Sequence, residues 1–575
     1  MLALICQMKT AASAKCVQKL HKVWKHFQPV RCLSNMQTNE SFLTTPIFYV
    51  NAVPHIGHLY SAVVGDAAHR WQCICGAKQA IFSTGTDEHG LKVQQAAEAA
   101  KLPPLQFCNE VSQKFKYLFD ANDIAYTDYV RTTEDRHNRA VNHIWKKLYD
   151  GGYIYQGEYE GWYSTADEAF LSNQQVHDVT VDGGNVQKVS IETGNPVEWT
   201  SEKNYMFRLS QMGPQLLEWL HTNPEAVRPS KFYAITKKYI EEGLQDLSVS
   251  RQRERLKWGI PVPDDPSQTI YVWLDALVNY LTVGGYPDKQ HVWPAIHIVG
   301  KDILRFHAIY WPSFLMAAGL QPPASVICHS HWTMNNYKMS KSRGNVVDPL
   351  DRTHRYTSDG LRYFLLREGT LHSDGDYNDD RLVNTLNADL GDTLGNLLSR
   401  VTAKSINPQQ VFPQFHSDLF PWQPSSSSST VVRALQEDYD LIESVQKLPD
   451  TVNMHYRNFE FHKALEAIMT CLRSTNGFVN RHQPWTLAKN PHEKPWLDTT
   501  NHVTMETLRV CGILLQPVIP KMADKLLNRL GIGENERTWV YLESFKTYHG
   551  KAGGYDGRQL GNSGGILFKK IKQIE

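Results

Sequence analysis

The 575-residue sequence lacks the features that mark disulfide-rich, zinc-finger and membrane-spanning proteins. It has nine cysteines, and they form no pair of Cys-x-x-Cys motifs, so neither a disulfide framework nor a structural zinc knuckle is predicted. No apolar run approaches the roughly 20 residues of a transmembrane helix, so we predict no membrane insertion. We also find no internal repeat. Few, unpatterned cysteines suit a reducing compartment.

Acidic residues are absent from residues 1–39. The same stretch carries six basic residues, which are Lys9, Lys15, Lys19, Lys22, Lys25 and Arg31. Together with its Leu, Val, Trp, Ser and Thr, this composition is typical of an organelle transit peptide, although Lys outnumbers Arg. We therefore predict a mitochondrial transit peptide over 1–39 and a mature protein in the mitochondrial matrix. The alternative interpretation is a disordered basic arm.

The overall composition is that of an ordinary globular protein. Hydrophobic residues make up 41% of the chain and charged residues 21%, which allows a sizeable core and excludes wholesale disorder. The length predicts several domains. Because the net charge is only +1, an RNA partner would have to meet positive charge that is concentrated locally.

Strand and helix patterns alternate in two stretches. Strands are predicted over 43–50 and 80–84, each followed by a turn and a helical pattern, and 268–320 return to the same α/β pattern. This order predicts a parallel sheet. Residues 151–265, rich in Gly, Tyr and Trp at their start, read as an insertion. After about residue 375 the leucines follow helical spacing and predict a helical bundle. They are Leu382, Leu386, Leu390, Leu394, Leu397 and Leu398.

Two motifs carry the chemistry. In the first, His55-Ile56-Gly57-His58, a strand gives way to a helix, so free N–H groups and the positive helix end can meet an anion. Both histidines can donate hydrogen bonds to phosphate, and Gly57 leaves room for an adenine ring. The second motif, Tyr-Lys-Met-Ser-Lys-Ser-Arg-Gly-Asn over 337–345, holds lysines that can follow charge developing on pyrophosphate. Either motif alone would be an ordinary histidine pair or a solvated lysine loop.

Together, in this order, the motifs resemble the HIGH and KMSKS signatures of class I aminoacyl-tRNA synthetases. The resemblance implies an α/β fold: a Rossmann-like parallel sheet with an inserted connective domain, followed by an α-helical anticodon-binding bundle. It also implies an ATP-using ligase in which positioning and charge stabilisation contribute most. The implied catalytic residues are His55, His58, Lys338 and Lys341. The implied contacts to ATP, which carries Mg²⁺, are His55, Gly57, His58, Gly300, Asp302, Lys338, Ser340 and Lys341.

Within that class, residues 42–545 resemble methionyl-tRNA synthetases. The shared patterns are PIFYVN (46–51), TGTDEHG (84–90), YVWLDAL (271–277) and HIVGKDI (297–303). Asp87 would hold the ammonium group of methionine, and Arg251 would pair with that aspartate. A thioether favours an aromatic and aliphatic cage. The family's methionine pocket maps onto Ile47, Tyr49, Trp273, Ala276, Leu277, Tyr280, Ile303 and His307.

The insertion departs from the family pattern. Many members carry zinc-binding cysteines there, whereas this chain has Ser164 and Ser172 near those positions and no cysteine between 109 and 327. We therefore predict no zinc, and no metal other than the Mg²⁺ of ATP. The insertion is also far shorter than the editing domains of the leucine, isoleucine and valine enzymes, so no separate hydrolytic editing site is predicted.

The resemblance also implies residues that read RNA. Asn396 and Arg400 are four apart, so they share one helix face, and Trp485 matches the family's tryptophan that stacks on an anticodon base. Without that context they would be a solvated helix face and a packing tryptophan. The implied partners are methionine, ATP and mitochondrial tRNA(Met), read through its CAU anticodon. The absence of an appended C-terminal domain favours a monomer.

These predictions divide the chain into seven parts. They are the transit peptide (1–39), the first half of the catalytic domain (40–150), the insertion and return (151–265), the second half of the catalytic domain (266–322), the lysine loop and stem-contact region (323–378), the helical anticodon-binding domain (379–548) and a C-terminal tail (549–575).

Three other functions compete with this interpretation. The first is a class I synthetase for Cys, Leu or Val, although a cysteine enzyme should show zinc ligands in its catalytic pocket. The second is a non-catalytic tRNA-binding relative, which should have lost His55, His58 or Lys341. The third is an adenylyltransferase that does not act on tRNA, which would not need the helical bundle.

Overall fold

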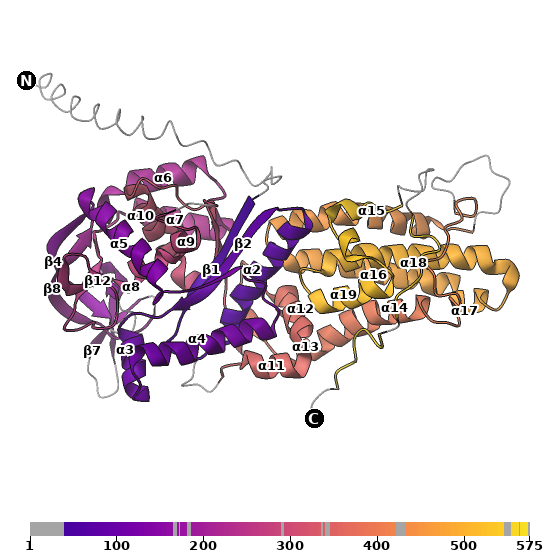
Figure 1. The fold of residues 1–575 in the computed structure, drawn as a ribbon, viewed down its shortest axis with the longest axis horizontal. Coiled ribbons are helices and arrows are strands. Elements are labelled where there is room, and N and C mark those ends of the chain that lie inside the picture. The colour runs from indigo at the N-terminus through magenta and orange to yellow at the C-terminus, as the bar shows by residue number, and fades with distance from the viewer. Residues whose placement is uncertain are drawn as a thin grey trace, which may run out of the picture.

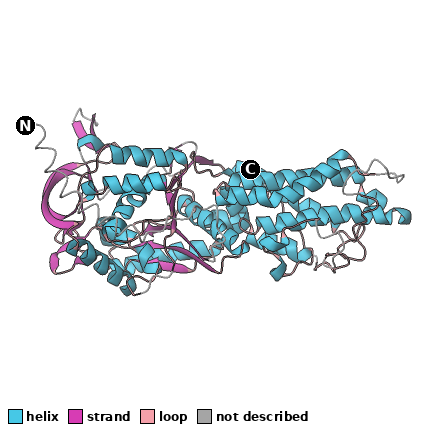
Figure 2. Cartoon of the chain, turned by 90° about the horizontal axis from the view of Figure 1, so that it is seen from above, coloured by secondary structure: helices cyan, strands magenta, loops and turns pink. Residues whose placement is uncertain are grey.

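The structure is a computed structural model. It describes residues 40–164, 169–171, 173–180, 186–191, 193–288, 292–334, 337–339, 345–420, 433–545, 554–562 and 564–572. The expected transit peptide therefore lies outside the described residues, as do Ser172, Ser340 and Lys341. Nearly all strands gather in one half of the molecule, and helices and loops make up the other half (Figures 1 and 2).

A six-stranded parallel sheet forms the centre of the first half. Its order is β3-β2-β1-β14-β15-β9, and every neighbouring pair is parallel. The chain winds outward from β1 through β2 to β3, then returns to the other side of β1 at β14. The predicted α/β fold with a Rossmann-like sheet is thereby confirmed. The strands are β1 (Glu40–Tyr49), β2 (Gln79–Asp87), β3 (Asp128–Arg131), β9 (Val227–Arg228), β14 (Ile296–Gly300) and β15 (Ser325–His329).

Helices cover this sheet and link its strands. Their apolar residues pack against the sheet, as with Leu59 and Val63 of α2, which are both fully buried. In such a sheet, ligands bind beyond the carboxyl ends of the strands where the winding direction reverses, which here is between β1 and β14. The helices are α2 (Ile56–Ile74), α3 (Leu91–Ala100), α4 (Pro104–Ala121), α5 (Asp135–Asp150), α8 (Val272–Leu277), α9 (Asn279–Val283) and α10 (Trp311–Ala317).

The stretch after α5 forms smaller antiparallel sheets. One is ordered β10-β8-β4-β5 and another β11-β13-β12, and helices α6 (Gly213–Thr222) and α7 (Ser230–Glu241) lie between β8 and β10 in sequence. The two-residue β9 within this stretch pairs with β15. The strands are β4 (Ile154–Ser164), β5 (Ala169–Leu171), β6 (Val176–Thr180), β7 (Val186–Ser190), β8 (Glu198–Phe207), β10 (Leu247–Ser248), β11 (Ser250–Gln252), β12 (Pro261–Val262) and β13 (Asp265–Ile270).

The second half is a helical bundle around α18, which is buried along most of its length. The leucines with helical spacing, from Leu382 to Leu398, are all at most 6% exposed, which confirms their predicted place in a helical core. Residues 554–562 and 564–572 pack back on the bundle: Arg558 donates to the Glu536 carboxylate, and the Ile571 amide donates to the Asn387 side chain. The helices are α11 (Pro349–Tyr356), α12 (Ser358–Glu368), α13 (Asp379–Leu386), α14 (Asn396–Val401), α15 (Gln436–Arg457), α16 (Phe461–His482), α17 (Pro484–Leu487), α18 (Lys494–Leu515) and α19 (Pro520–Arg529).

A buried ion pair joins the two halves. Arg362 of α12 lies 2.5 Å from the Asp66 carboxylate of α2, and both side chains are fully buried. The same guanidinium donates to the carbonyl oxygens of Asn122, Pro517 and Val518. One side chain therefore links α2, the end of α4 and the turn between α18 and α19. Across the described residues, no helix is long and apolar enough to span a bilayer.

Candidate active site

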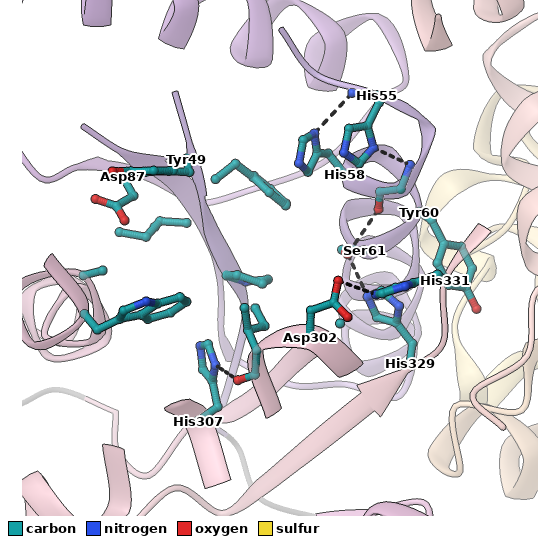
Figure 3. Close-up of a pocket in the computed structure, with 18 of the residues that line it drawn as sticks. Tyr49, His55, His58, Tyr60, Ser61, Asp87, Asp302, His307, His329 and His331 are labelled. Atoms are coloured by element: carbon teal, nitrogen blue, oxygen red, sulfur yellow. Dashed lines mark hydrogen bonds and ion pairs between the residues drawn. The ribbon is translucent and has the colours of Figure 1, made fainter. Parts of the chain in front are cut away.

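A pocket of about 390 Å³ opens at the carboxyl ends of β1, β2, β14 and β15 (Figure 3). It lies where the fold predicts a ligand site, because the winding of the parallel sheet reverses there. The pocket brings together most of the residues that the sequence assigned to ATP and methionine. These are Ile47, Tyr49, His55, Gly57, His58, Asp87, Trp273, Ala276, Leu277, Tyr280, Gly300, Asp302, Ile303 and His307.

Two histidines cap the first turn of α2. The Nδ1 atom of His55 accepts a hydrogen bond from the Gly57 amide at 3.1 Å, and Nδ1 of His58 accepts from the His55 amide at 3.2 Å. This is a reciprocal capping box built from imidazoles. The two rings stack with centroids 3.7 Å apart. Because a neutral imidazole has one donor and one acceptor, each ring carries its proton on Nε2.

The histidine cap is thus a pair of N–H donors at the positive end of a helix. Burial, and then the neighbouring His55, hold the pKa of His58 well below 6.5, so His58 is neutral at physiological pH. A Cβ atom on Gly57 would lie 3.0 Å from the ring of His55, so a larger residue would push that ring away. This arrangement suits phosphate oxygens, which accept hydrogen bonds and are stabilised by the helix dipole.

Aromatic side chains form the opposite part of the pocket. The indole of Trp273 stacks on Phe306, with centroids 3.7 Å apart and an angle of 12° between the planes. His307 donates from Nδ1 to the Ile303 carbonyl at 2.9 Å, so its Nε2 accepts from the Tyr280 hydroxyl at 2.7 Å. Burial lowers the pKa of His307 to about 4, and the bond to Ile303 offsets part of that fall. The wall is therefore neutral and fixed in orientation.

A second histidine supports this wall from beneath. Nε2 of His297 accepts from the Trp311 indole at 3.1 Å, so its Nδ1 donates to the Thr44 hydroxyl at 2.8 Å. The His297 ring lies 4.1 Å from that of Tyr280, centroid to centroid. Burial, and then His307, keep the pKa of His297 well below 6.5. Tyr280 is therefore held both by a hydrogen bond and by ring packing.

Asp87 supplies a carboxylate at the end of β2. Only 8% of the residue is exposed, and its side chain lies beside Tyr49 on the side of the pocket away from Asp302 (Figure 3). Arg251 is buried on β11 and is not among the pocket-lining residues. Its guanidinium lies 4.4 Å from the centre of the Tyr271 ring and donates to the Ser248 hydroxyl. The predicted pairing of Arg251 with Asp87 stays a prediction.

The wall at β15 contains residues that the sequence analysis missed. The Ser61 hydroxyl lies 2.7 Å from Nε2 of His329, and Nε2 of His331 lies 3.3 Å from the Asp302 carboxylate (Figure 3). Two signals could have revealed them: Ser61 is one helical turn beyond His58, and His329 and His331 follow a strand whose end meets the same edge of the sheet. Other missed lining residues are Pro46, Phe48, Tyr60, Lys92, Val272, Asn279, Ser330, Trp332, Met339 and Val346.

The lysine loop borders the pocket at Met339. Strand β17 (Tyr337–Lys338) contains the backbone of Lys338, whereas Ser340 and Lys341 lie outside the described residues. Their predicted contacts with ATP stay predictions. No group of three or more His, Cys, Asp or Glu side chains that could hold a metal occurs in the described ranges, and the predicted lack of zinc stays a prediction.

The residues assigned to RNA lie in the bundle, away from the pocket. Asn396 donates to the Asp392 carboxylate at 3.2 Å, and Arg400 donates to the Asn480 side chain at 3.3 Å. Trp485 is 41% exposed on α17, at the end of the bundle farther from the parallel sheet (Figure 1). An exposed indole next to a proline-initiated helix offers a flat face to a partner.

The parallel sheet and the histidine-capped helix at its switch point define a class I tRNA synthetase. The family described as "tRNA synthetases class I (M)" matches residues 41–402, and the "Anticodon binding domain of methionyl tRNA ligase" matches residues 431–573. The chain therefore belongs to the methionine–tRNA ligase family.

Curated relatives match this chain over nearly its whole length. Mitochondrial methionine–tRNA ligase of Takifugu rubripes is 52% identical, covering 98% of this chain and 95% of the relative. The human mitochondrial enzyme is also 52% identical, covering 93% and 91%. Mycobacterium tuberculosis methionyl-tRNA synthetase in complex with methionyl-adenylate has a TM-score of 0.81 at 37% identity, covering 88% and 96%. The vertebrate relatives indicate that this chain is a mitochondrial member of the family.

Proposed function

We propose that the pocket condenses methionine with ATP to methionyl-adenylate and then transfers the methionyl group to the 3′-terminal adenosine of tRNA(Met). The observation that carries this proposal is the joining, in one cavity, of the histidine cap with a buried carboxylate and an aromatic wall. Adenylate formation requires hydrogen-bond donors to the phosphates on one side of the cavity and a binding site for the amino acid on the other. A structural neighbour at 37% identity is itself described as a methionyl-adenylate complex.

In the first step the methionine carboxylate attacks the α-phosphate of ATP, and pyrophosphate leaves. Negative charge spreads over the phosphoryl oxygens, so fixed donors stabilise the transition state more than the ground state. Neutral His55 and His58 offer two Nε2–H donors, and the helix dipole adds positive potential. We assign the same task to Lys338 and Lys341 on the pyrophosphate side. No group has to exchange a proton in this step, so correct placement contributes most.

ATP would bind along the wall that runs from Gly57 to Asp302. The exposed carboxylate of Asp302, 3.3 Å from His331, is suited to accept hydrogen bonds from ribose hydroxyls, and Gly300 leaves its rim free of a side chain. We assign Ser340 to the same substrate. ATP would enter as its Mg²⁺ complex, because Mg²⁺ prefers phosphate oxygens and water and is usually bound with the substrate.

Methionine would place its thioether against the aromatic wall and its ammonium group at Asp87. Trp273, Tyr280 and His307 are held by stacking and hydrogen bonds, so the cage is preformed. Arg251 would limit the charge near Asp87. The remaining assigned residues complete the apolar lining; they are Ile47, Tyr49, Ala276, Leu277 and Ile303.

We further propose a monomer in the mitochondrial matrix that reads the CAU anticodon of tRNA(Met) through Asn396, Arg400 and Trp485. The acid-free, basic composition of residues 1–39 supports import into the matrix. A reporter fused to residues 1–39 should be imported into mitochondria, and a cytosolic reporter would contradict this.

Amino-acid-dependent exchange of pyrophosphate into ATP tests the proposed activity directly. The mature chain should exchange with methionine and not with leucine, valine or cysteine. Added tRNA(Met) should then be charged with methionine. Exchange that depended on one of the other amino acids, or charging without any exchange, would refute the assignment.

Replacing Trp485 by alanine should separate the two half-reactions. A lost base stack costs about 1–3 kcal/mol, so kcat/KM for tRNA charging should fall roughly 10- to 100-fold, while pyrophosphate exchange stays at the wild-type rate. The matched control is Trp199→Ala, because that tryptophan is also exposed but lies on the insertion. Equal losses in charging and exchange would contradict a role in RNA reading.

A further inference from the structure

A buried carboxylate behind the pocket joins three separate segments. Oδ2 of Asp275 accepts from Nδ1 of His89 at 2.7 Å, and Oδ1 accepts from Nε2 of His137 at 2.7 Å. Asp275 and His137 are fully buried, and His89 is 6% exposed. We call this group the Asp275 clamp. It ties α8 to the segment after β2 and to the first turn of α5, and its three members are absent from the pocket lining.

The clamp carboxylate is ionised. Burial raises the pKa of Asp275, but the charge of His89 and the hydrogen bonds from both histidines outweigh it and hold the pKa at about 2. An ionised carboxylate only accepts hydrogen bonds, and each histidine must present an N–H to it. Two short, charge-assisted bonds to one carboxylate fix direction as well as distance.

The residue between Asp87 and His89 is anchored on the opposite side. Both carboxylate oxygens of Glu88 accept from Arg131 of β3, at 2.6 and 2.9 Å, and Glu88 also accepts from Thr133 at 2.6 Å. The Asp87 carbonyl accepts from the Val50 amide at 3.1 Å. Glu88 is therefore held toward β3 and His89 toward α8. These anchors leave the Asp87 carboxylate little freedom to move.

We propose that Asp275 is a positioning residue for methionine recognition. It sets the separation between the ammonium-binding carboxylate of Asp87, two residues before His89, and the aromatic wall, which begins at Trp273, two residues before Asp275. The proposal rests on the proposed function, because it assumes that methionine spans Asp87 and Trp273. The clamp acts through these neighbours and touches no substrate atom.

The first test is Asp275→Asn, which keeps the volume of the side chain. The asparagine side chain can accept a hydrogen bond from one histidine, but it turns its own N–H₂ toward the other. One of the two hydrogen bonds of the clamp is therefore lost. The methionine KM in pyrophosphate exchange should rise at least about tenfold, while the ATP KM stays within about threefold. Adding Asp275→Asn to Asp87→Asn should change the methionine KM by much less than tenfold, because the clamp acts through Asp87.

Asp438→Asn is the matched control for lost stability. Asp438 of α15 is also a fully buried carboxylate and accepts from Arg481 and His482, but it lies in the bundle. The Asp438→Asn substitution should lower Tm without changing the methionine KM. If Asp275→Asn only lowered Tm, raised both KM values equally, or added fully to Asp87→Asn, the positioning role would be overturned.

A second pair of variants covers the case in which Asp275→Asn does not fold. His89→Asn keeps an N–H near the place of Nδ1–H and should retain a methionine KM within about threefold of wild type, whereas His89→Ala should raise it at least about tenfold. Equal values for the two variants would overturn the proposal. Wild-type protein that failed to exchange with methionine would instead refute the proposed function, so the two failures are distinguishable.

Discussion

Replacing Asp87 by asparagine should lower kcat/KM for methionine about 10²- to 10⁴-fold in pyrophosphate exchange. The substitution keeps the shape of a residue that is only 8% exposed and removes its charge, so the ammonium group of methionine enters a buried site without a counter-ion. Breaking a buried ion pair from one side costs about 3–5 kcal/mol. The loss should fall mainly on methionine, because Asp87 lies across the pocket from the histidine cap.

The measurement is a set of exchange rates over a grid of methionine and ATP concentrations. A matched control is Asp302→Asn, which changes a carboxylate on the side of the same pocket that we assign to ATP and should raise the ATP KM more than the methionine KM. Equal losses for both substrates in the Asp87 variant would contradict its role at the ammonium group.

Replacing His58 by asparagine should reduce kcat for exchange about 10²- to 10³-fold with little change in Tm. The asparagine side-chain oxygen falls near the place of Nδ1 and can keep the bond from the His55 amide, so the helix cap survives. The Nε2–H donor is lost, and one missing transition-state donor costs about that factor. In His58→Gln the side-chain amide reaches the place of Nε2 instead, so the donor to phosphate is kept and the bond from the His55 amide is lost. This variant should keep more of the activity than His58→Asn.

The pH profile provides a further check on His58. Since burial and His55 hold its pKa well below 6.5, the neutral ring is the working form, and protonation matters only in acid. Wild type and His58→Asn should therefore show the same pH dependence of kcat above about pH 6. A pH limb near 7 that disappears in the variant would show that His58 acts as a titrating group instead.

The central features of the fold were accessible from the sequence because they depend on local pattern. The strand before His55 is apolar and β-branched, and the bundle leucines repeat at helical spacing, so both elements and their order could be predicted. Ligand sites of parallel sheets form at the carboxyl ends of the strands. This explains why His55, Asp87 and Gly300 meet, since Asp87 and Gly300 end β2 and β14 and His55 comes shortly after β1. The two-residue β9, by contrast, is too short to leave a pattern.

The Asp275 clamp and the His329 contact with Ser61 could not be predicted in the same way. His89 and Asp275 are 186 residues apart, and Ser61 and His329 are 268 apart. A buried aspartate in a short apolar helix carries no local sign of which donors it will meet. The tautomer of a histidine cannot be predicted from the sequence either. His58 carries its proton on Nε2 because the His55 amide donates to Nδ1, and only the folded helix cap shows this contact.

The ion pair between Arg362 and Asp66 has a consequence for how the protein melts. The two family matches, at 41–402 and 431–573, suggest separable modules, yet the fully buried guanidinium of Arg362 in the first also donates to the Pro517 and Val518 carbonyls in the second. Its partner Asp66 lies on the helix that the histidines cap. Opening the second module away from the first would leave this buried guanidinium without two of its hydrogen-bond acceptors, which is costly for a charged donor. Catalytic and anticodon-reading regions should therefore unfold in a single cooperative transition, with loss of exchange and loss of bundle helicity sharing one midpoint.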